Sequence, residues 1–169
     1  MYDWVNGKPA VILRERDLAR WPGGRGLTAS EQGAFVAMRE HEGVPAVVLR
    51  DHELTTLVPL ELGGVLLVTA VYCDGDEAIT SFLDMLPLSG WDVLPQRLVS
   101  DGGEYALFDG SLTATQLGDP RMADKIDREH GGVLTFPLPA GTYDVESFGP
   151  WHPDERTELW LTRVVRAGH

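Results

Sequence analysis

The fold is decided by the longest apolar run of the chain, Val65-Leu66-Leu67-Val68-Thr69-Ala70-Val71-Tyr72. A strand with one solvent-facing side alternates apolar and polar side chains, but this run is apolar almost throughout. Such a run is typical of a central strand that is covered on both faces. It is far shorter than the roughly 20 residues needed to span a bilayer. The run therefore predicts the central strand of a sheet.

A helix is expected soon after this strand, over residues 76–86. Apolar residues recur there at the spacing of one helix face, namely Ile79, Phe82, Leu83 and Leu86. Asp74 or Asp76 would cap the N-terminus, where negative charge suits the helix dipole, and Pro87 would end the helix. We expect the apolar face of this helix to pack on the sheet that contains residues 65–72.

Apolar runs bounded by turn residues predict the other strands, at 10–14, 34–40, 44–50, 96–99, 104–108, 133–138, 142–147 and 157–165. Short Gly-containing turns indicate three hairpins: 34–40 with 44–50, 96–99 with 104–108, and 133–138 with 142–147. Pro137 cannot donate to a ladder, so its strand belongs at an edge or a bulge. A capping-box spacing of Thr28 and Glu31 predicts one more helical turn, over 27–32. The expected fold is α+β and mostly β: a mixed or antiparallel twisted sheet with one main helix, in a single domain over 1–169.

An internal echo accompanies these strands. Residues 11–18, VILRERDL, are similar to residues 47–54, VVLRDHEL, and more weakly to residues 105–113. In each copy an acidic residue follows the strand, where it would cap a turn, and a Leu further on would fold back onto the core. The echo indicates either a duplicated strand–turn–strand unit or a chance likeness between strand ends. We expect the leucines of these strands to be buried: Leu13, Leu49, Leu66, Leu107 and Leu134.

The charge balance limits the classes of partner. Fourteen Lys and Arg residues against 26 Asp and Glu residues give a net charge of −12. Such a chain is repelled by nucleic acids and by anionic membrane surfaces, and it attracts basic partners. The same acidity is also common in proteins that are merely soluble. The opening residues have neither a basic nor an apolar signal region, so a cytoplasmic protein is expected.

No motif predicts a catalytic, cofactor-binding or metal-binding residue. Residues 24–29, GRGLTA, match a dinucleotide fingerprint, but a loop rather than a strand precedes them. His41 and His52 flank a predicted hairpin and could approach each other, yet no histidine has metal-ligand spacing. Cys73 has acidic neighbours that raise a thiol pKa, so it is expected to be a buried, inert thiol.

Two acidic clusters are the candidates for partner binding: Asp74, Asp76 and Glu77 at the predicted helix start, and Asp154, Glu155 and Glu158 before the last strand. Each cluster has two interpretations, either caps with a solvated loop or a contact surface for a basic partner. Trp151 lies beside the second cluster and is a candidate anchor. Like Trp151, the residues Trp4, Trp21 and Trp91 lie in or beside predicted loops. We expect most of these tryptophans to cover the ends of the sheet.

The order of these elements resembles the immunity protein 21 family of bacterial polymorphic toxin systems. The resemblance rests on strand and turn residues: Trp4-Val5 with Gly7, Val11 to Leu13, Leu18-Ala19 with Trp21, residues 34–38, Val48-Leu49 with Asp51, Thr55-Thr56, Gly63-Gly64-Val65-Leu66, Leu107-Phe108-Asp109, and Pro139-x-Gly141-x-Tyr143-x-Val145. It departs from the family at Tyr72-Cys73 and over the insertion 116–130. The last hairpin is also similar to the competence-operon nuclease inhibitors.

The resemblance implies a cytoplasmic immunity protein that is not an enzyme and needs no cofactor. Such a protein would bind a cognate toxin and neutralise it by occlusion and charge complementarity, and the acidic balance of this chain fits a basic, nuclease-like toxin. Two alternatives remain open from the residues. One is a small-molecule or carbohydrate-binding β module, and the other is a small hydrolase that uses clustered Asp, Glu and His.

Overall fold

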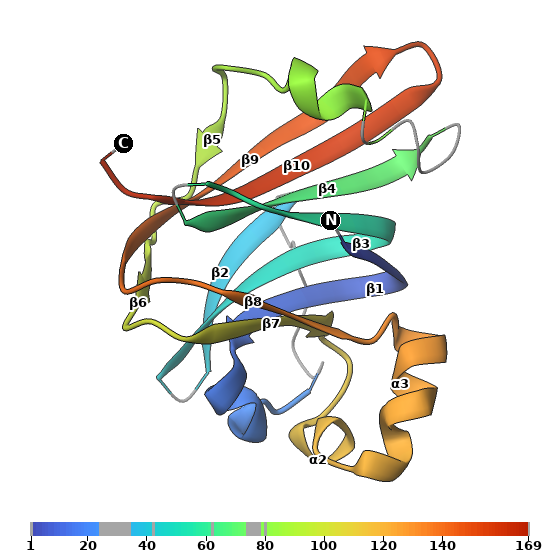
Figure 1. Ribbon diagram of the computed structural model, residues 1–169, viewed down its shortest axis with the longest axis vertical. Coiled ribbons are helices and arrows are strands. Elements are labelled where there is room, and N and C mark those ends of the chain that lie inside the picture. Colours follow the sequence, from blue (N-terminus) through green and yellow to red (C-terminus); the bar gives the residue numbers. More distant parts are fainter. Residues whose placement is uncertain are drawn as a thin grey trace.

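The computed structural model describes residues 2–23, 35–41, 43–61, 63–73, 79 and 81–168, with side chains except those of residues 2–8, 41, 50–54 and 129. In this part every strand pairing is antiparallel. The strands are β1 Tyr2–Arg14, β2 Val36–His41, β3 Val44–Pro59, β4 Gly64–Tyr72, β5 Asp92–Val93, β6 Leu98–Ser100, β7 Glu104–Asp109, β8 Val133–Pro137, β9 Gly141–Asp154 and β10 Thr157–Arg166. The helices are η1 Glu15–Arg20, η2 Leu83–Met85, α2 Ala114–Leu117, η3 Pro120–Met122 and α3 Ala123–His130 (Figure 1). The mostly β character predicted from the sequence is confirmed. No helix within the described residues is long and apolar enough to cross a membrane.

Strand β4 is central and buried on both faces, as its apolar run predicts. It lies between β10 and β3 in the sheet order. Val65 and Leu67 face the inside of the curled sheet, whereas Leu66, Val68 and Ala70 face outward under a covering segment. Burial ends at Val71 and Tyr72, which are exposed.

The sheet curls until its two ends meet (Figure 1). Strand β6 pairs with β9 from Leu98↔Tyr143 to Ser100↔Gly141, and β7 pairs with β8 from Glu104↔Pro137 to Phe108↔Val133. Both pairings share one uninterrupted register, and the Leu138 N–H donates to the Gly103 carbonyl at 2.9 Å between them. Because β9 also pairs with β10 and β7 also pairs with β1, this bent ribbon joins the two ends of the sheet.

Two predicted hairpins are therefore wrong. Residues 96–99 do not pair with 104–108, and 133–138 do not pair with 142–147. The turn residues are present, but they bend a strand instead of reversing it. Gly102 and Gly103 take φ values of 93° and 110°, which glycine adopts at little steric cost. The first predicted hairpin is confirmed, because β2 pairs with β3 from Val36↔Leu49 to His41↔Val44. Pro137 ends the edge strand β8, as expected.

Three apolar clusters hold the layers together. The inner core lies inside the curled sheet, and its largest fully buried members are Tyr105, Tyr143, Ile12, Leu49, Leu57, Leu67, Leu98 and Leu107. The lower outer core covers β1, β3 and β7 with Trp21, Leu18 and Leu117 from η1 and α2 and their flanks. The upper outer core covers β4, β9 and β10 with Ile79, Phe82, Leu83, Leu86 and Trp91.

The predicted apolar stripe thus packs on β4, but the long helix is only loosely supported. Within 76–86 the structure describes residues 79 and 81–86, and the part from Leu83–Met85 is the 3-10 helix η2. The longest helix among the described residues is α3, within the insertion 116–130 to which the sequence assigned no structure. The predicted turn over 27–32 and the fingerprint 24–29 lie outside the described residues.

Most of the echoed positions behave as predicted. Leu13, Leu49, Leu66 and Leu107 are at most 2% exposed, whereas Leu134 on the edge strand β8 is only half-buried. The three copies form neighbouring strands, since β1 lies between β3 and β7. The predicted exit at Asp51 is wrong, because β3 continues to Pro59. At the third exit the Ser111 N–H donates to Asp109 Oδ1 at 2.8 Å and Leu112 is buried, as expected.

An ion-pair network holds η1 to the bend that follows β6. Arg14 Nε donates to Asp17 Oδ2 at 2.9 Å and Arg14 Nη1 donates to Asp101 Oδ1 at 2.8 Å. Arg16 also donates to Asp101. The hydrogen bonds from Arg16 and then Arg14 lower the pKa of Asp101 below its ordinary value. The network links the N-terminal strand to the ribbon that closes the sheet.

Truncating Leu49 tests the inner core. Leu49→Ala should lower the free energy of unfolding by about 2–5 kcal/mol, because it removes a fully buried side chain from a packed interior. Leu88→Ala is the matched control, since Leu88 is 99% exposed, and it should change stability by less than about 0.5 kcal/mol. Urea denaturation measures both. Equal effects of the two substitutions would contradict the assigned core.

The network at Asp101 predicts a pH effect. Its lowered folded pKa means that the ionised carboxylate adds stability above about pH 3.9, its ordinary value. That contribution is lost as the pH falls through the lower folded value. The stability difference between wild type and Asp101→Asn should therefore be present at neutral pH and shrink in acid. Asp92→Asn, at an exposed aspartate with no hydrogen bond described, should show no such difference. Denaturant unfolding at a series of pH values decides between these outcomes.

Candidate functional site

The predicted partner-binding residues divide into two groups. Asp74, Asp76 and Glu77 lie outside the described residues. Asp154 and Glu155 are exposed at the turn between β9 and β10, where the Arg156 N–H donates to Asp154 Oδ1 at 2.8 Å. Asp154 therefore has the capping role expected of a turn aspartate, while its carboxylate still faces solvent.

Glu158 follows this turn and lies beside the end of β4. It is half-buried, pairs with Tyr72 across the strands, and accepts a hydrogen bond from Trp160 Nε1 at 3.3 Å. The fold thus places the second acidic cluster next to the exposed residues Val71 and Tyr72. In the sequence, the first cluster begins two residues after Tyr72, at Asp74.

Trp151 covers the upper outer core, so its ring is not fully available as an anchor for a partner. It is half-buried, and its ring makes an edge contact with Phe82 at 6.3 Å between centroids. The expectation that loop tryptophans cover the sheet also holds for Trp21, which is 5% exposed and donates to the Gly110 carbonyl. Trp91 is half-buried as well and packs near Phe148, with 5.7 Å between ring centroids. The side chain of Trp4 lies outside those described.

Most of the exposed apolar side chains come from one stretch of the sequence. Seven large hydrophobic residues are exposed among those the structure describes, and five of them come from residues 71–93: Val71, Tyr72, Met85, Leu88 and Val93. Leu88 is 99% exposed. Figure 1 shows η2 and the β9–β10 turn at the top of the molecule, with β5 lower on the left and the end of β4 lower on the right. Contiguous exposed apolar groups on a folded domain mark interaction surfaces.

One stretch of the chain carries no Lys or Arg. Residues 51–96 contain no Lys or Arg and eight acidic residues: Asp51, Glu53, Glu61, Asp74, Asp76, Glu77, Asp84 and Asp92. The described arginines elsewhere are largely neutralised by neighbours, as in the pairs Arg97–Asp144 and Arg121–Asp119. The sequence contains this signal, a stretch without Lys or Arg, but the prediction of a binding site relied on two short acidic clusters instead.

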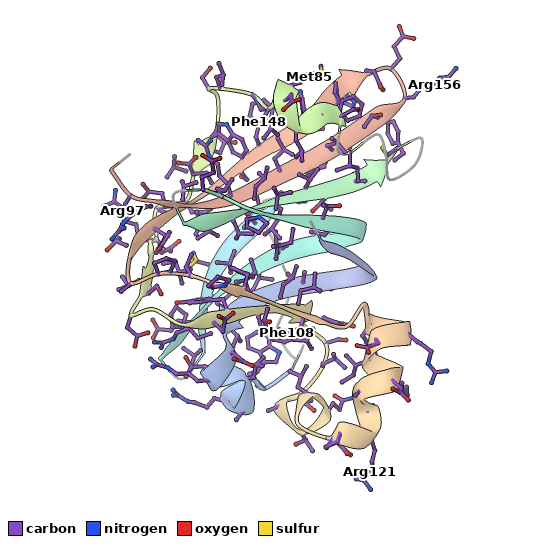
Figure 2. All side chains as sticks on the ribbon, in the orientation of Figure 1. Met85, Arg97, Phe108, Arg121, Phe148 and Arg156 are labelled. Carbon is purple, nitrogen blue, oxygen red and sulfur yellow. The ribbon has the colours of Figure 1, made fainter. Side chains whose placement is uncertain are left out.

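We name this region the acidic–apolar end. It consists of Val71, Tyr72, Asp84, Met85, Leu88, Asp92, Val93, Asp154, Glu155 and Glu158. Met85 and Arg156 lie toward it in Figure 2, whereas Arg121 lies at the opposite end of the molecule. A surface that exposes both apolar side chains and carboxylates suits a partner surface of positive charge with apolar anchors.

His41 and His52 do not come together, although the sequence suggested that they could. His41 pairs with Val44, whereas His52 lies eight residues further along β3 (from 44 to 52), roughly 26 Å away at the rise of a strand. The described residues contain no group of three His, Cys, Asp or Glu side chains that could hold a metal. Cys73 is half-buried beside the upper outer core, not fully buried as predicted.

One buried acid–histidine pair was missed. His130 Nδ1 lies 2.5 Å from Asp109 Oδ2, and the Asp109 side chain is fully buried. His130 is the last residue of α3, so the pair fixes the end of this helix to the end of β7. Their separation by 21 positions in the sequence hid the pairing from sequence reasoning. The contact accounts for α3 docking and lies away from the acidic–apolar end.

A double-mutant cycle tests the assignment of Trp151 as a lid. Phe82→Ala and Trp151→Ala should each destabilise the protein, and together they should show a coupling energy of about 0.5–1.5 kcal/mol, as aromatic pairs in contact do. Trp151→Ala combined with Leu117→Ala, in the lower outer core, should be additive within about 0.5 kcal/mol. Denaturant melts supply the four free energies of each cycle. Additivity of the Phe82 pair would mean that Trp151 is free to serve a partner.

Compared with models of known protein families, with curated proteins and with solved structures, the chain gives no significant match in any of the three.

Proposed function

We propose that this protein binds a basic partner protein through its acidic–apolar end and blocks that partner by occupying its surface. The observation that carries the proposal is a coincidence of two features at one end. Its members include five exposed apolar side chains from residues 71–93 and the exposed carboxylates of Asp84, Asp92, Asp154 and Glu155, with Arg156 the neighbouring cation at the β9–β10 turn. Neither feature alone distinguishes a binding surface from an ordinary acidic one.

The carboxylates would act mainly on the rate of encounter. Charges on a rim steer a partner of opposite sign, and they add less to the lifetime of the complex. The steering acts over roughly one Debye length, about 8 Å at physiological ionic strength. Asp84, Asp92, Asp154 and Glu155 are exposed and spread along this end, so they present a broad negative field.

The apolar side chains would supply affinity after encounter. Met85, Leu88 and Val93 project from the segment that covers β4, β9 and β10, which is anchored beneath by Ile79 and Phe82. An anchored support limits the ordering cost when a partner docks. The segment is therefore suited to hold apolar anchors in place.

The kind of partner rests on the resemblance to the immunity protein 21 family. On that basis the partner is a toxin domain made by the same or a neighbouring cell, and the protein acts in the cytoplasm. Binding that covers a toxin's active surface needs no chemistry from the inhibitor. The net charge of −12 fits a basic toxin such as a nuclease.

The test is association kinetics with the product of the neighbouring gene. Asp154→Asn, Glu155→Gln and Glu158→Gln together should lower the on-rate and flatten its salt dependence. A matched control changes three carboxylates outside the acidic–apolar end: Glu15→Gln, Glu104→Gln and Asp124→Asn. The control alters net charge by the same amount, so it should affect the on-rate much less.

The off-rate gives an independent readout. Leu88→Ser should speed dissociation and leave the melting temperature within a few degrees, because Leu88 is fully exposed. Equal effects of both charge variants, together with an unchanged off-rate for Leu88→Ser, would remove the acidic–apolar end as the binding surface.

A further inference from the structure

A groove on the outer face of the sheet lies between the β3–β4 turn and the last residues of β10. Its volume is about 440 Å³, and its walls include Leu60, Glu61, Glu146, Arg163, Val165 and Arg166. Small-molecule sites in proteins are commonly of this size. The groove shares none of its lining with the acidic–apolar end.

Arg163 is held rigidly in this groove. Its Nε donates to Glu146 Oε2 at 2.5 Å, and its guanidinium carbon lies 4.0 Å from the centre of the Trp91 ring. Trp91 is itself fixed, because its Nε1 donates to the Pro87 carbonyl at 2.9 Å. The hydrogen bond that the structure describes for Arg163 uses Nε alone, so its Nη groups remain to donate. A fixed guanidinium with free Nη groups is prepared to bind a carboxylate.

The groove also offers the opposite charge. Glu61 is exposed at the β3–β4 turn, and Glu146 is mostly buried but keeps a second oxygen beyond the one that accepts from Arg163. Arg166 is exposed and uses Nη2 to donate to the Ala140 carbonyl at 3.2 Å. Two carboxylates and two guanidinium groups leave the lining without net charge. Such a site disfavours polyanions such as nucleotides and suits a ligand that carries both charges.

The rest of the lining narrows the ligand class. Leu60 and Val165 provide an apolar wall. A sugar would need an open aromatic face on which to stack, but Arg163 covers one face of Trp91 and Phe148 packs against the same ring. An aliphatic side chain fits the remaining wall better than a sugar ring.

We propose that this groove binds a small zwitterion, an α-amino acid or a short peptide with an apolar side chain. The ligand carboxylate would accept from Arg163 and Arg166, its ammonium group would donate to Glu61 and Glu146, and its side chain would contact Leu60 and Val165. The groove shares no lining residue with the acidic–apolar end, although Val93 of that end pairs with Glu146, and the proposal does not depend on the proposed function.

The experiment titrates the full chain with each probe and measures binding by calorimetry and by amide NMR shifts. L-leucine and L-leucyl-L-leucine are the two probes, and the tighter of them identifies a free amino acid or a peptide as the ligand source. N-acetyl-L-leucine lacks the ammonium group and L-leucinamide lacks the carboxylate. Each should bind at least about tenfold more weakly than L-leucine, since each loses a charged hydrogen bond worth ~1.4 kcal/mol or more.

Variants identify the groups involved. Glu61→Gln should weaken L-leucine binding and leave N-acetyl-L-leucine unchanged, because only the first ligand has an ammonium group for Glu61. Arg166→Gln should weaken both ligands. Arg121→Gln, at an exposed arginine on η3, is the matched control and should weaken neither. Absence of binding by both probes, equal binding of the three leucine derivatives, or shifts confined to residues outside the groove would each overturn the proposal.

Discussion

The structure depends on one continuous antiparallel ladder. It runs from Leu98↔Tyr143 to Phe108↔Val133 without a slip in register, although both of its strands bend on the way. One half of the ribbon extends the sheet next to β10 and the other half extends it next to β1. Because a single ribbon belongs to both ends, the sheet must curl, and its curl encloses the inner core. Joining the ends also pairs backbone groups that would otherwise form open edges.

The sequence predicted the strands much better than their partners. Nine of the strand positions followed from apolar runs and turn residues, and the double burial of β4 followed from its unbroken apolar character. The partners of β6 and β8 did not follow, because Gly-rich turns signal a change of direction without saying how large it is. A hairpin and a bend use the same residues near Gly102 and Gly141, and only the whole sheet selects between them. Here tertiary strand pairing, and not local propensity, decides whether the chain forms a hairpin or a bend.

The candidate surface was predictable in part for a similar reason. The charge of a segment can be read directly from its residues. Asp154 and Glu155 could therefore be selected as acidic residues, and they were found at an exposed turn. The exposure of an apolar residue cannot be read from the sequence in that way. Leu88 and Met85 look like core residues in sequence, and they are exposed because Phe82 and Ile79 take the places on the sheet. The Asp109–His130 pair was missed because it joins residues far apart in the chain.

The position of β4 has a consequence for synthesis of the chain on the ribosome. One of its neighbours, β3, precedes it directly, but the other, β10, begins at Thr157, 85 residues after Tyr72 (157 minus 72). At about 5–20 residues per second, β4 waits for several seconds with one edge unpaired. The residues that cover its outer face, such as Ile79 and Phe82, are made soon after it, so what remains open is the backbone edge that later pairs with β10. Completion of the sheet around β4 therefore depends on some of the last residues to be made, Thr157–Arg166.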